Sequence, residues 1–335
     1  MRARIESLCA RWGGDRLLVQ GAGGNVSWKL GDVLQVKASG TWLAQALERD
    51  VFVPVDLAAM RAAVAASDFG ATPRVLGDAV ARPSIETALH ALMPQPVVAH
   101  LHMVDALARL VRSDGGDALA LLRQAGLRCA EVAYCKPGAS LARAVAAALR
   151  DMPDADVLLM RNHGIVAGAA SVDAIDDLVA RIGTLLACSA AIEPAPTDAP
   201  PIAGLVPLDE LGLHALACDA QLLRRVADDW ALYPDHVVFL GPVASIAGRD
   251  PLPTADAAWP VFVPGRGVYA RAPLPPAQAA QLRCYADVIA RQPASASLRR
   301  LAETEIGELV DWDAERYRQS LQAATRAPEP LTAVP

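Results

Sequence analysis

Runs of adjacent apolar residues alternate along the chain with segments whose apolar residues recur at helical spacing. Strand candidates in the first part are 17–20, 26–28, 33–36, 51–55, 96–102, 129–134 and 156–160. Helix candidates around them are 2–13, 57–67, 86–93, 105–125, 141–150 and 172–192. This alternation, with hairpin-like spacing near the N-terminus, predicts an α/β fold in which helices cover both faces of a mixed central sheet.

A proline-rich segment interrupts the pattern. Residues 193–207 hold five prolines, which favours a linker between a first domain, 1–192, and a smaller C-terminal α+β domain, 208–325. The elements expected in that second domain are helices over 214–232 and 277–290, strands over 237–240 and 259–263, and two further helices that end near 321. Residues 326–335 are expected to form a tail without fixed structure.

Composition narrows the class of protein. The chain is 53% hydrophobic, enough for a large core, and its net charge of −6 argues against a nucleic-acid partner. Its six cysteines are scattered and form no Cys-x-x-Cys pair, which indicates reduced and mostly buried thiols. No apolar stretch has the length of a membrane span or the form of a signal peptide, so we expect a cytoplasmic protein without a membrane partner.

The strand candidate over 96–102 carries His100 and His102. Side chains two residues apart in a strand point to the same face, so the two imidazoles should project side by side and could chelate zinc or a similar divalent ion. His163 follows another apolar strand candidate and precedes Gly164. Three histidines leave a fourth position open for substrate or water, as in catalytic zinc sites. The alternative is a buried polar pair whose hydrogen bonds are satisfied by the backbone.

Glu86 stands at the start of the helix candidate that leads into this strand. Ser84 is expected to cap that helix and Glu86 to lie in its first turn. One short unit could therefore hold an anion at Ser84 and a base at Glu86 beside the metal. Ordinary stabilisation of the helix dipole is the other reading of Glu86, and we expect His90 to be a core or supporting histidine.

Two small-residue loops near the N-terminus are suited to an anion. The loops are 21–25, Gly-Ala-Gly-Gly-Asn, and 37–40, Lys-Ala-Ser-Gly. Loops of this kind bring backbone N–H groups close to an anion, while Lys37 adds a charge and Asn25 and Ser39 add donors. Strand-like residues follow the first loop, so it is not a dinucleotide fingerprint.

Residues 1–195 resemble the class II aldolase and adducin family, which includes zinc-dependent fuculose-phosphate and rhamnulose-phosphate aldolases. Five motifs carry the resemblance in order: 21–27 (GAGGNVS), 37–41 (KASGT), 84–86 (SIE), 100–102 (HLH) and 162–164 (NHG). The chain as a whole looks most similar to the aldolase portion of bifunctional rhamnulose-phosphate aldolase/dehydrogenases. The resemblance implies a three-layer αβα domain with a mixed, largely antiparallel sheet.

The resemblance also implies a function. It implies retro-aldol cleavage of a ketose phosphate or related sugar acid through a metal-stabilised enediolate, with Glu86 as the catalytic group. Zn²⁺, or another divalent ion such as Mn²⁺ or Co²⁺, would bind His100, His102 and His163. The substrate phosphate would lie against Asn25, Lys37, Ser39, Gly40 and Ser84. Ile85 departs from the family, which often has a small hydroxyl residue there, and this leaves room for a different anionic group.

The resemblance leaves alternatives open. Epimerisation, dehydration and decarboxylation of a sugar phosphate would use the same site. A non-enzymatic, adducin-like binding module is a further alternative, although such modules lack the metal histidines that are present here. Family members commonly form tetramers, so we expect a homotetramer or another homo-oligomer, and the proton-donor tyrosine cannot be placed by motif, with Tyr134 and Tyr233 as candidates.

The second domain contains a partial echo of the first. The segment around His163-Gly164 runs from an apolar strand candidate into a helix candidate, and the segment around Arg266-Gly267 does the same. With the two glycines aligned, Arg266 stands where His163 stands. One hypothesis is that the second domain is a degenerate partial copy unable to bind metal. Convergent strand–turn–helix patterning is the alternative, and it is the reading that the sequence favours.

Overall fold

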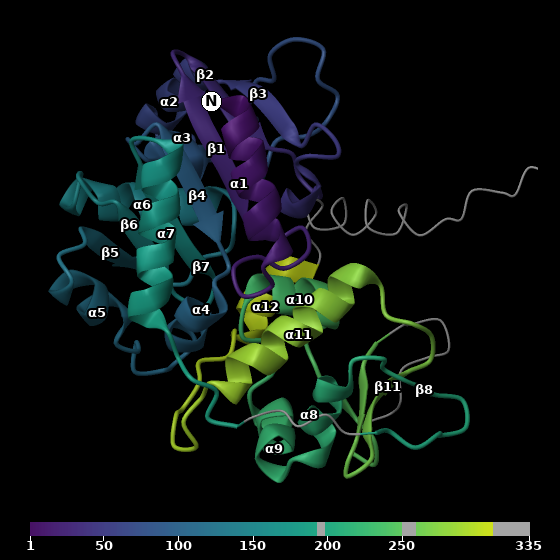
Figure 1. Cartoon of the computed structure of the whole chain (residues 1–335). Coiled ribbons are helices and arrows are strands. Elements are labelled where there is room, and N and C mark those ends of the chain that lie inside the picture. Colours follow the sequence, from purple (N-terminus) through teal and green to yellow (C-terminus); the bar gives the residue numbers. More distant parts are fainter. Residues whose placement is uncertain (193–197, 250–258, 311–335) are drawn as a thin grey trace, which may run out of the picture.

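A seven-stranded sheet forms the centre of the larger part of the molecule. The computed structural model describes residues 1–192, 198–249 and 259–310 (Figure 1). The strands of this sheet are β1 (Asn25–Leu30), β2 (Val33–Lys37), β3 (Phe52–Asp56), β4 (Val97–Leu101), β5 (Cys129–Val132), β6 (Val157–Met160) and β7 (Gly164–Ala169). Their order is β3-β2-β1-β4-β7-β6-β5, and every pair is antiparallel except β5 with β6. The predicted mixed, largely antiparallel sheet is thereby confirmed.

Helices cover both faces of this sheet (Figure 1). One face carries α1 (Arg2–Gly14), α4 (Val104–Leu110), α5 (Ala118–Gln124) and α7 (Val172–Leu186), with a short 3-10 helix at Leu43–Gln45 packed on α1. The other face carries α2 (Leu57–Ala65), α3 (Thr87–Leu92) and α6 (Ala139–Asp151). Alternation along β4 explains the two layers: Val97 and Ala99 pack toward α1 and α7, and Val98 packs toward α3 and α6.

A second, four-stranded sheet lies in the C-terminal part (Figure 1). Its strands are β8 (Val206–Pro207), β9 (Ser245–Ile246), β10 (Val261–Val263) and β11 (Gly267–Ala270). The helices of this part are α8 (Ala215–Cys218), α9 (Ala220–Asp228), α10 (Pro234–Leu240), α11 (Pro276–Ala290) and α12 (Glu303–Val310), preceded by a 3-10 helix at Leu211–His214. Among the helices in the described ranges, none combines the length and apolarity that crossing a membrane requires.

Helix α4 joins the two parts. Its buried residues Val104, Leu107 and Ala108 belong to one apolar cluster with residues of α10 and α11. Hydrogen bonds surround this cluster, including one of 2.7 Å from Arg291 Nε to the Asp105 carboxylate. Because α4 follows β4 closely in the chain, the C-terminal part packs near the end of β4, the strand that carries His100. Of the linker expected over 193–207, residues 193–197 lie outside the described residues. Its last two residues form β8.

The secondary structure departs from the sequence prediction in several places, among them the helix expected over 172–192, which ends at Leu186. Residues 17–20 form a turn rather than a strand, and 105–125 contains two helices because Gly115 and Gly116 both adopt positive φ. The single helix expected over 214–232 is divided between α8 and α9, and Asp219 caps the second of these. Residues 237–240 belong to α10 and are not a strand. Their apolar side chains are buried together in the C-terminal core, so the run carries no period that could identify a helix.

The small sheet repeats the order of four of the seven strands of the large one. Taken in chain order, β4, β5, β6 and β7 correspond to β8, β9, β10 and β11. In both sets the first strand is antiparallel to the fourth, the fourth to the third, and the second is parallel to the third. A 15-residue helix, α7 or α11, follows each set. The predicted echo is therefore consistent with the strand order, although its origin by duplication stays a prediction. The tail at 326–335 and the helix expected near 321 lie outside the described residues.

Candidate metal centre and active site

The three predicted metal histidines lie together at one end of the large sheet. His100 lies in β4, His102 follows the end of this strand, and His163 lies in the turn between β6 and β7. One ring nitrogen from each lies within 4.8 Å of the others, and all three residues are buried. Gly164 permits this approach, because a Cβ atom there would stand 2.5 Å from the Leu101 carbonyl oxygen and 3.1 Å from the His102 ring.

Hydrogen bonds fix which nitrogen of each ring faces the site. His100 Nδ1 donates to the Ile165 carbonyl at 2.9 Å, so its Nε2 keeps a lone pair toward the cluster. His102 Nε2 lies 3.0 Å from His100 Nε2. Burial lowers the pKa of His102 to about 3, against the opposing effect of the Asp235 carboxylate. A neutral imidazole is the form that binds a divalent metal.

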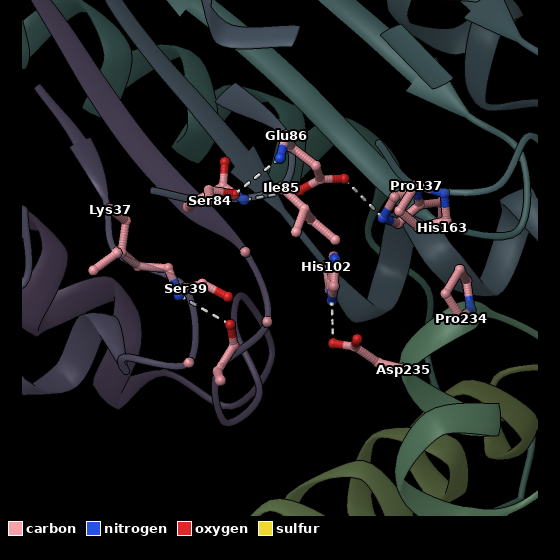
Figure 2. A pocket seen from close by; sticks show the side chains of 16 residues that line it. Lys37, Ser39, Ser84, Ile85, Glu86, His102, Pro137, His163, Pro234 and Asp235 are labelled. Carbon is pink, nitrogen blue, oxygen red and sulfur yellow. Dashed lines mark hydrogen bonds and ion pairs between the residues drawn. The ribbon is translucent and has the colours of Figure 1, made fainter. Parts of the chain in front are cut away.

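Glu86 lies against the histidines from α3. Its Oε1 is 3.4 Å from His163 Nε2 (Figure 2). Its Oε2 is 3.4 Å from His100 Nε2. Burial opposes ionisation, but the imidazole rings and the Asn25 amide outweigh it and lower the pKa of Glu86 to about 2. Oε1 is buried and has no hydrogen-bond donor among the described residues. A buried carboxylate oxygen without a donor beside three imidazoles is a donor set that fits a divalent cation.

A buried chain of hydrogen bonds holds Glu86 from behind. Asn25 Nδ2 donates to Glu86 Oε2 at 2.8 Å, so Asn25 Oδ1 must accept, and it does so from His90 Nε2. His90 Nδ1 then accepts from the Ser27 hydroxyl at 2.7 Å. Burial lowers the pKa of His90 to about 3, which keeps this ring neutral. His90 thus supports the site as expected, and Asn25 makes a contact with Glu86 that the sequence did not indicate.

The anion-loop residues surround a pocket beside the histidines. Lys37 Nζ donates to the Ala22 carbonyl at 2.9 Å and to the Thr41 carbonyl at 2.6 Å, which ties the two small-residue loops together. Ser84 Oγ accepts from the Glu86 N–H at 3.2 Å, and the helix begins after Glu86 rather than after Ser84. The predicted site residues that line the pocket are Asn25, Lys37, Ser39, Gly40, Ser84, Glu86, His102 and His163. Ile85 also lines it (Figure 2).

The C-terminal part also reaches this pocket. Pro234 and Asp235, the first two residues of α10, complete its lining, and Asp235 Oδ2 lies 3.4 Å from His102 Nδ1 (Figure 2). No motif in the sequence marked Asp235. A local signal was available for the helix that carries it, since proline followed by an acidic residue is typical of a helix N-terminus. Of the two candidate tyrosines, neither Tyr134 nor Tyr233 is among the lining residues.

Comparison with known proteins identifies the larger part of the chain. Residues 5–186 match the family model described as Class II Aldolase and Adducin N-terminal domain. An 85-residue segment is 39% identical to the uncharacterized oxidoreductase YuxG of Bacillus subtilis, covering 25% of this chain and 12% of that protein. The chain therefore matches only a small part of the length of this relative.

Two solved structures are also similar to this chain. The N-terminal class II aldolase domain of a protein from Thermoplasma acidophilum has a TM-score of 0.45 and 23% identity, over 55% of this chain and 90% of that one. L-fuculose-1-phosphate aldolase from Thermus thermophilus has a TM-score of 0.38 and 21% identity, over 56% of this chain and 92% of that one. With the family model matching more than half of its length, the chain belongs to the class II aldolase and adducin family.

Proposed function

We propose that the protein is a divalent-metal-dependent lyase that cleaves a ketose phosphate or related sugar acid by a retro-aldol reaction. The observation that carries this proposal is the convergence of three buried imidazoles and the Glu86 carboxylate beside an anion-suited pocket. An adducin-like binding module has no need for such a donor set. The metal ligands in this proposal are His100, His102 and His163.

The metal would supply one part of the chemistry. His100, His102 and His163 would hold a divalent ion, which would supply Lewis-acid stabilisation of negative charge on substrate oxygens. Substrate would approach from the pocket, which Glu86, His102 and His163 line. Zinc fits a site of three imidazoles, and manganese or cobalt could replace it.

Glu86 would move the protons. In retro-aldol cleavage a hydroxyl on the leaving fragment loses its proton and becomes a carbonyl, and the remaining fragment gains a proton at carbon. With its pKa lowered to about 2, Glu86 is an ionised carboxylate that can accept the first proton and return it. Asn25 holds Oε2 in place for this transfer, so that Oε1 is the oxygen that remains available.

The anionic end of the substrate would bind between the two loops that Lys37 ties together. Backbone N–H groups and the side chains of Ser39 and Ser84 would contact it, with the Lys37 charge close behind. Ile85 places an apolar side chain in the same lining, where a hydroxyl donor would otherwise add to phosphate binding. A carboxylate, with fewer acceptor oxygens than a phosphate, is therefore an alternative anionic group.

The first experiment measures the metal content of protein purified without chelator, beside a His100→Ala/His102→Ala double variant. We expect about one divalent ion per chain in the wild type and loss of this ion in the double variant. The metal-loaded protein is then screened against ketose phosphates and sugar acids for release of an aldehyde. A wild type that takes up no zinc, manganese or cobalt would overturn the proposal in favour of a binding module.

Glu86→Gln separates metal binding from proton transfer. The amide keeps the size of the side chain but cannot accept the proton, so we expect metal content to stay near one per chain while kcat falls by about 10²–10⁴-fold. Glu131→Gln, which changes an exposed glutamate on β5, is the matched control and should retain full turnover. Normal turnover of the Glu86 variant would exclude the proposed role.

We also propose that the protein is a cytoplasmic homo-oligomer. All six cysteines are free, including the buried Cys9 and Cys284, as suits a reducing compartment. The oligomer rests on the family, whose enzymes commonly place active sites at subunit boundaries. Light scattering of the purified protein would give the size of the assembly, and a monomer that cleaves substrate at full rate would exclude this part of the proposal.

A further inference from the structure

Asp235 is a buried carboxylate that the proposed reaction does not yet use. It belongs to α10 in the C-terminal part, is 3% exposed, and lines the pocket formed by the large sheet. Its Oδ2 lies 3.4 Å from His102 Nδ1, and Gln281 Nε2 of α11 donates to the same oxygen at 3.4 Å. Figure 2 shows the side chain directed at the His102 ring from the side opposite to Glu86.

The contact involves the nitrogen of His102 that faces away from the cluster. His102 Nε2 points toward His100 Nε2, so Nδ1 is left to interact with the C-terminal part. A carboxylate can only accept a hydrogen bond, and it therefore selects the tautomer with the proton on Nδ1. In that tautomer the Nε2 lone pair is available to a metal. A carboxylate behind a metal-binding imidazole also orients the ring and raises its basicity.

The glycine loop is shaped around this contact. A Cβ atom on Gly23 would lie 2.8 Å from Asp235 Oδ2 and 2.8 Å from His102 Nδ1. Gln20, just before the loop, donates from Nε2 to the His102 carbonyl at 3.2 Å. The ring of His102 is thus held by Asp235, its backbone by Gln20, and the absence of a side chain on Gly23 leaves room for both.

The segment just before Asp235 is hydrogen-bonded to Asn162, the neighbour of His163 in the chain. Asn162 Nδ2 donates to the carbonyls of Leu232 at 2.8 Å and Arg299 at 2.7 Å. Ala231, with a φ of 59°, gives the chain a sharp change of direction between α9 and α10. The C-terminal part is therefore bound to the residue before one metal histidine and touches the ring of another.

We propose that Asp235 is a positioning residue that holds His102 in the metal-binding tautomer, so that metal affinity depends on the docked C-terminal part. This inference rests on the metal site proposed above. It gives the C-terminal part a role at the active site: it supplies the outer support of one metal ligand from the same chain. The role requires no contact between Asp235 and the metal or the substrate.

The test measures metal affinity rather than turnover. Apoprotein is titrated with Zn²⁺ or Co²⁺ against a chromophoric chelator for the wild type, Asp235→Asn and Asp235→Ala. We expect the alanine variant to bind about 10–100-fold more weakly and the asparagine variant, which keeps an uncharged acceptor, to lie in between. The absorption bands of bound Co²⁺ should shift in both variants, because the ligand strength of His102 changes when its contact with Asp235 changes.

The matched control is Asp229→Asn. Asp229 is another buried carboxylate of the C-terminal part, paired with Arg225 at 2.7 Å and absent from the pocket lining. Its loss should lower the thermal midpoint without changing metal affinity. Gly23→Ala is a second probe: its φ is not in the left-handed region, so its methyl group would act mainly as a wedge between Asp235 and His102. It should weaken metal binding although no ligand is changed.

The outcomes separate this inference from the proposed function. Wild-type protein without metal affinity would defeat the function itself. Metal binding in the wild type that is lost in His100→Ala/His102→Ala but unchanged in Asp235→Ala would keep the function and overturn the role of Asp235. If Asp235→Ala fails to fold, Asp235→Asn and Gly23→Ala decide: weaker binding in both supports the inference, and wild-type affinity in both overturns it.

Discussion

The contacts of single residues at this site could be predicted from the sequence only where local strand geometry determines them. Asn25 was assigned to an anion loop, and it does line the pocket, yet its amide is bonded to Glu86 and its carbonyl to His90. The His-x-His pair was predictable because strand geometry alone places two such rings on one face. The hydrogen-bond chain behind Glu86 was not, because Ser27, Asn25 and His90 meet only once β1 lies beside β4 and α3 covers them.

His236 allows a test of burial at the scale of one residue. It lies in α10 among the rings of Trp230, Tyr233 and Tyr285, and Nδ1 accepts from the Leu232 N–H at 3.4 Å. Burial lowers its pKa from 6.5 to about 3. Between these values the unfolded chain binds a proton at His236 and the folded chain does not. Stability from this residue is therefore complete above about pH 6.5 and is lost as the pH falls toward 3.

We expect His236→Asn to remove this pH dependence. Asparagine keeps an acceptor near the Leu232 N–H but does not titrate. Between pH 6 and pH 4 the free energy of unfolding of the wild type should fall more steeply, by up to about 1.4 kcal/mol per pH unit. Urea unfolding at a series of pH values measures both slopes. Parallel curves for the two proteins would show that the imidazole is protonated in the folded state.

At the scale of elements, the sequence predicts helices that have a clear period and some strands that are short apolar runs, and it fails where an apolar run fits either structure. Strands β4 and β6 were recognisable as short apolar runs, and α7 by its helical spacing. The run over 237–240 resembles a strand in the sequence, because four apolar residues in succession fit either structure. The run is helical because Pro234 and Asp235 favour the start of a helix, and because the C-terminal core buries every side chain of the run.

The repeated strand order predicts a structural superposition. If the second sheet is a degenerate copy, residues 155–190 and 258–293 should superpose as strand, turn, strand and helix, with Gly267 on Gly164. Arg266 would then correspond to His163. Arg266 is exposed, and its guanidinium is unsuited to bind a metal. The metal content should accordingly stay at about one ion per chain rather than two. Superposition with a different path of the chain between the strands would favour convergence.

At the scale of the whole molecule, the two predicted domains, 1–192 and 208–325, share one cluster of buried apolar residues. The apolar face of α4 packs against α10 and α11, and a single cluster of buried residues spans both parts. Sequence patterns could not foresee this, because α4 has apolar residues on more than one side and its second partner lies more than a hundred residues away. The linker composition marks where the chain crosses between the parts, but not how firmly they dock.

Deleting residues 206–335 should therefore damage the larger part itself. Val104, Leu107 and Val111 would lose their cover, and each buried aliphatic side chain contributes about 1.5–3 kcal/mol, against a total stability of about 5–15 kcal/mol for a domain. We expect the truncated protein to aggregate or to bind metal more weakly than the Asp235 variants, as measured by solubility, light scattering and metal titration. Co-expression of 1–197 and 198–335 as separate chains should restore both properties, because apolar packing and hydrogen bonds, rather than the covalent connection, hold the two parts together. A truncated protein that stays soluble and binds metal as tightly as the full chain would show that α4 needs no partner and that the C-terminal part has its role elsewhere.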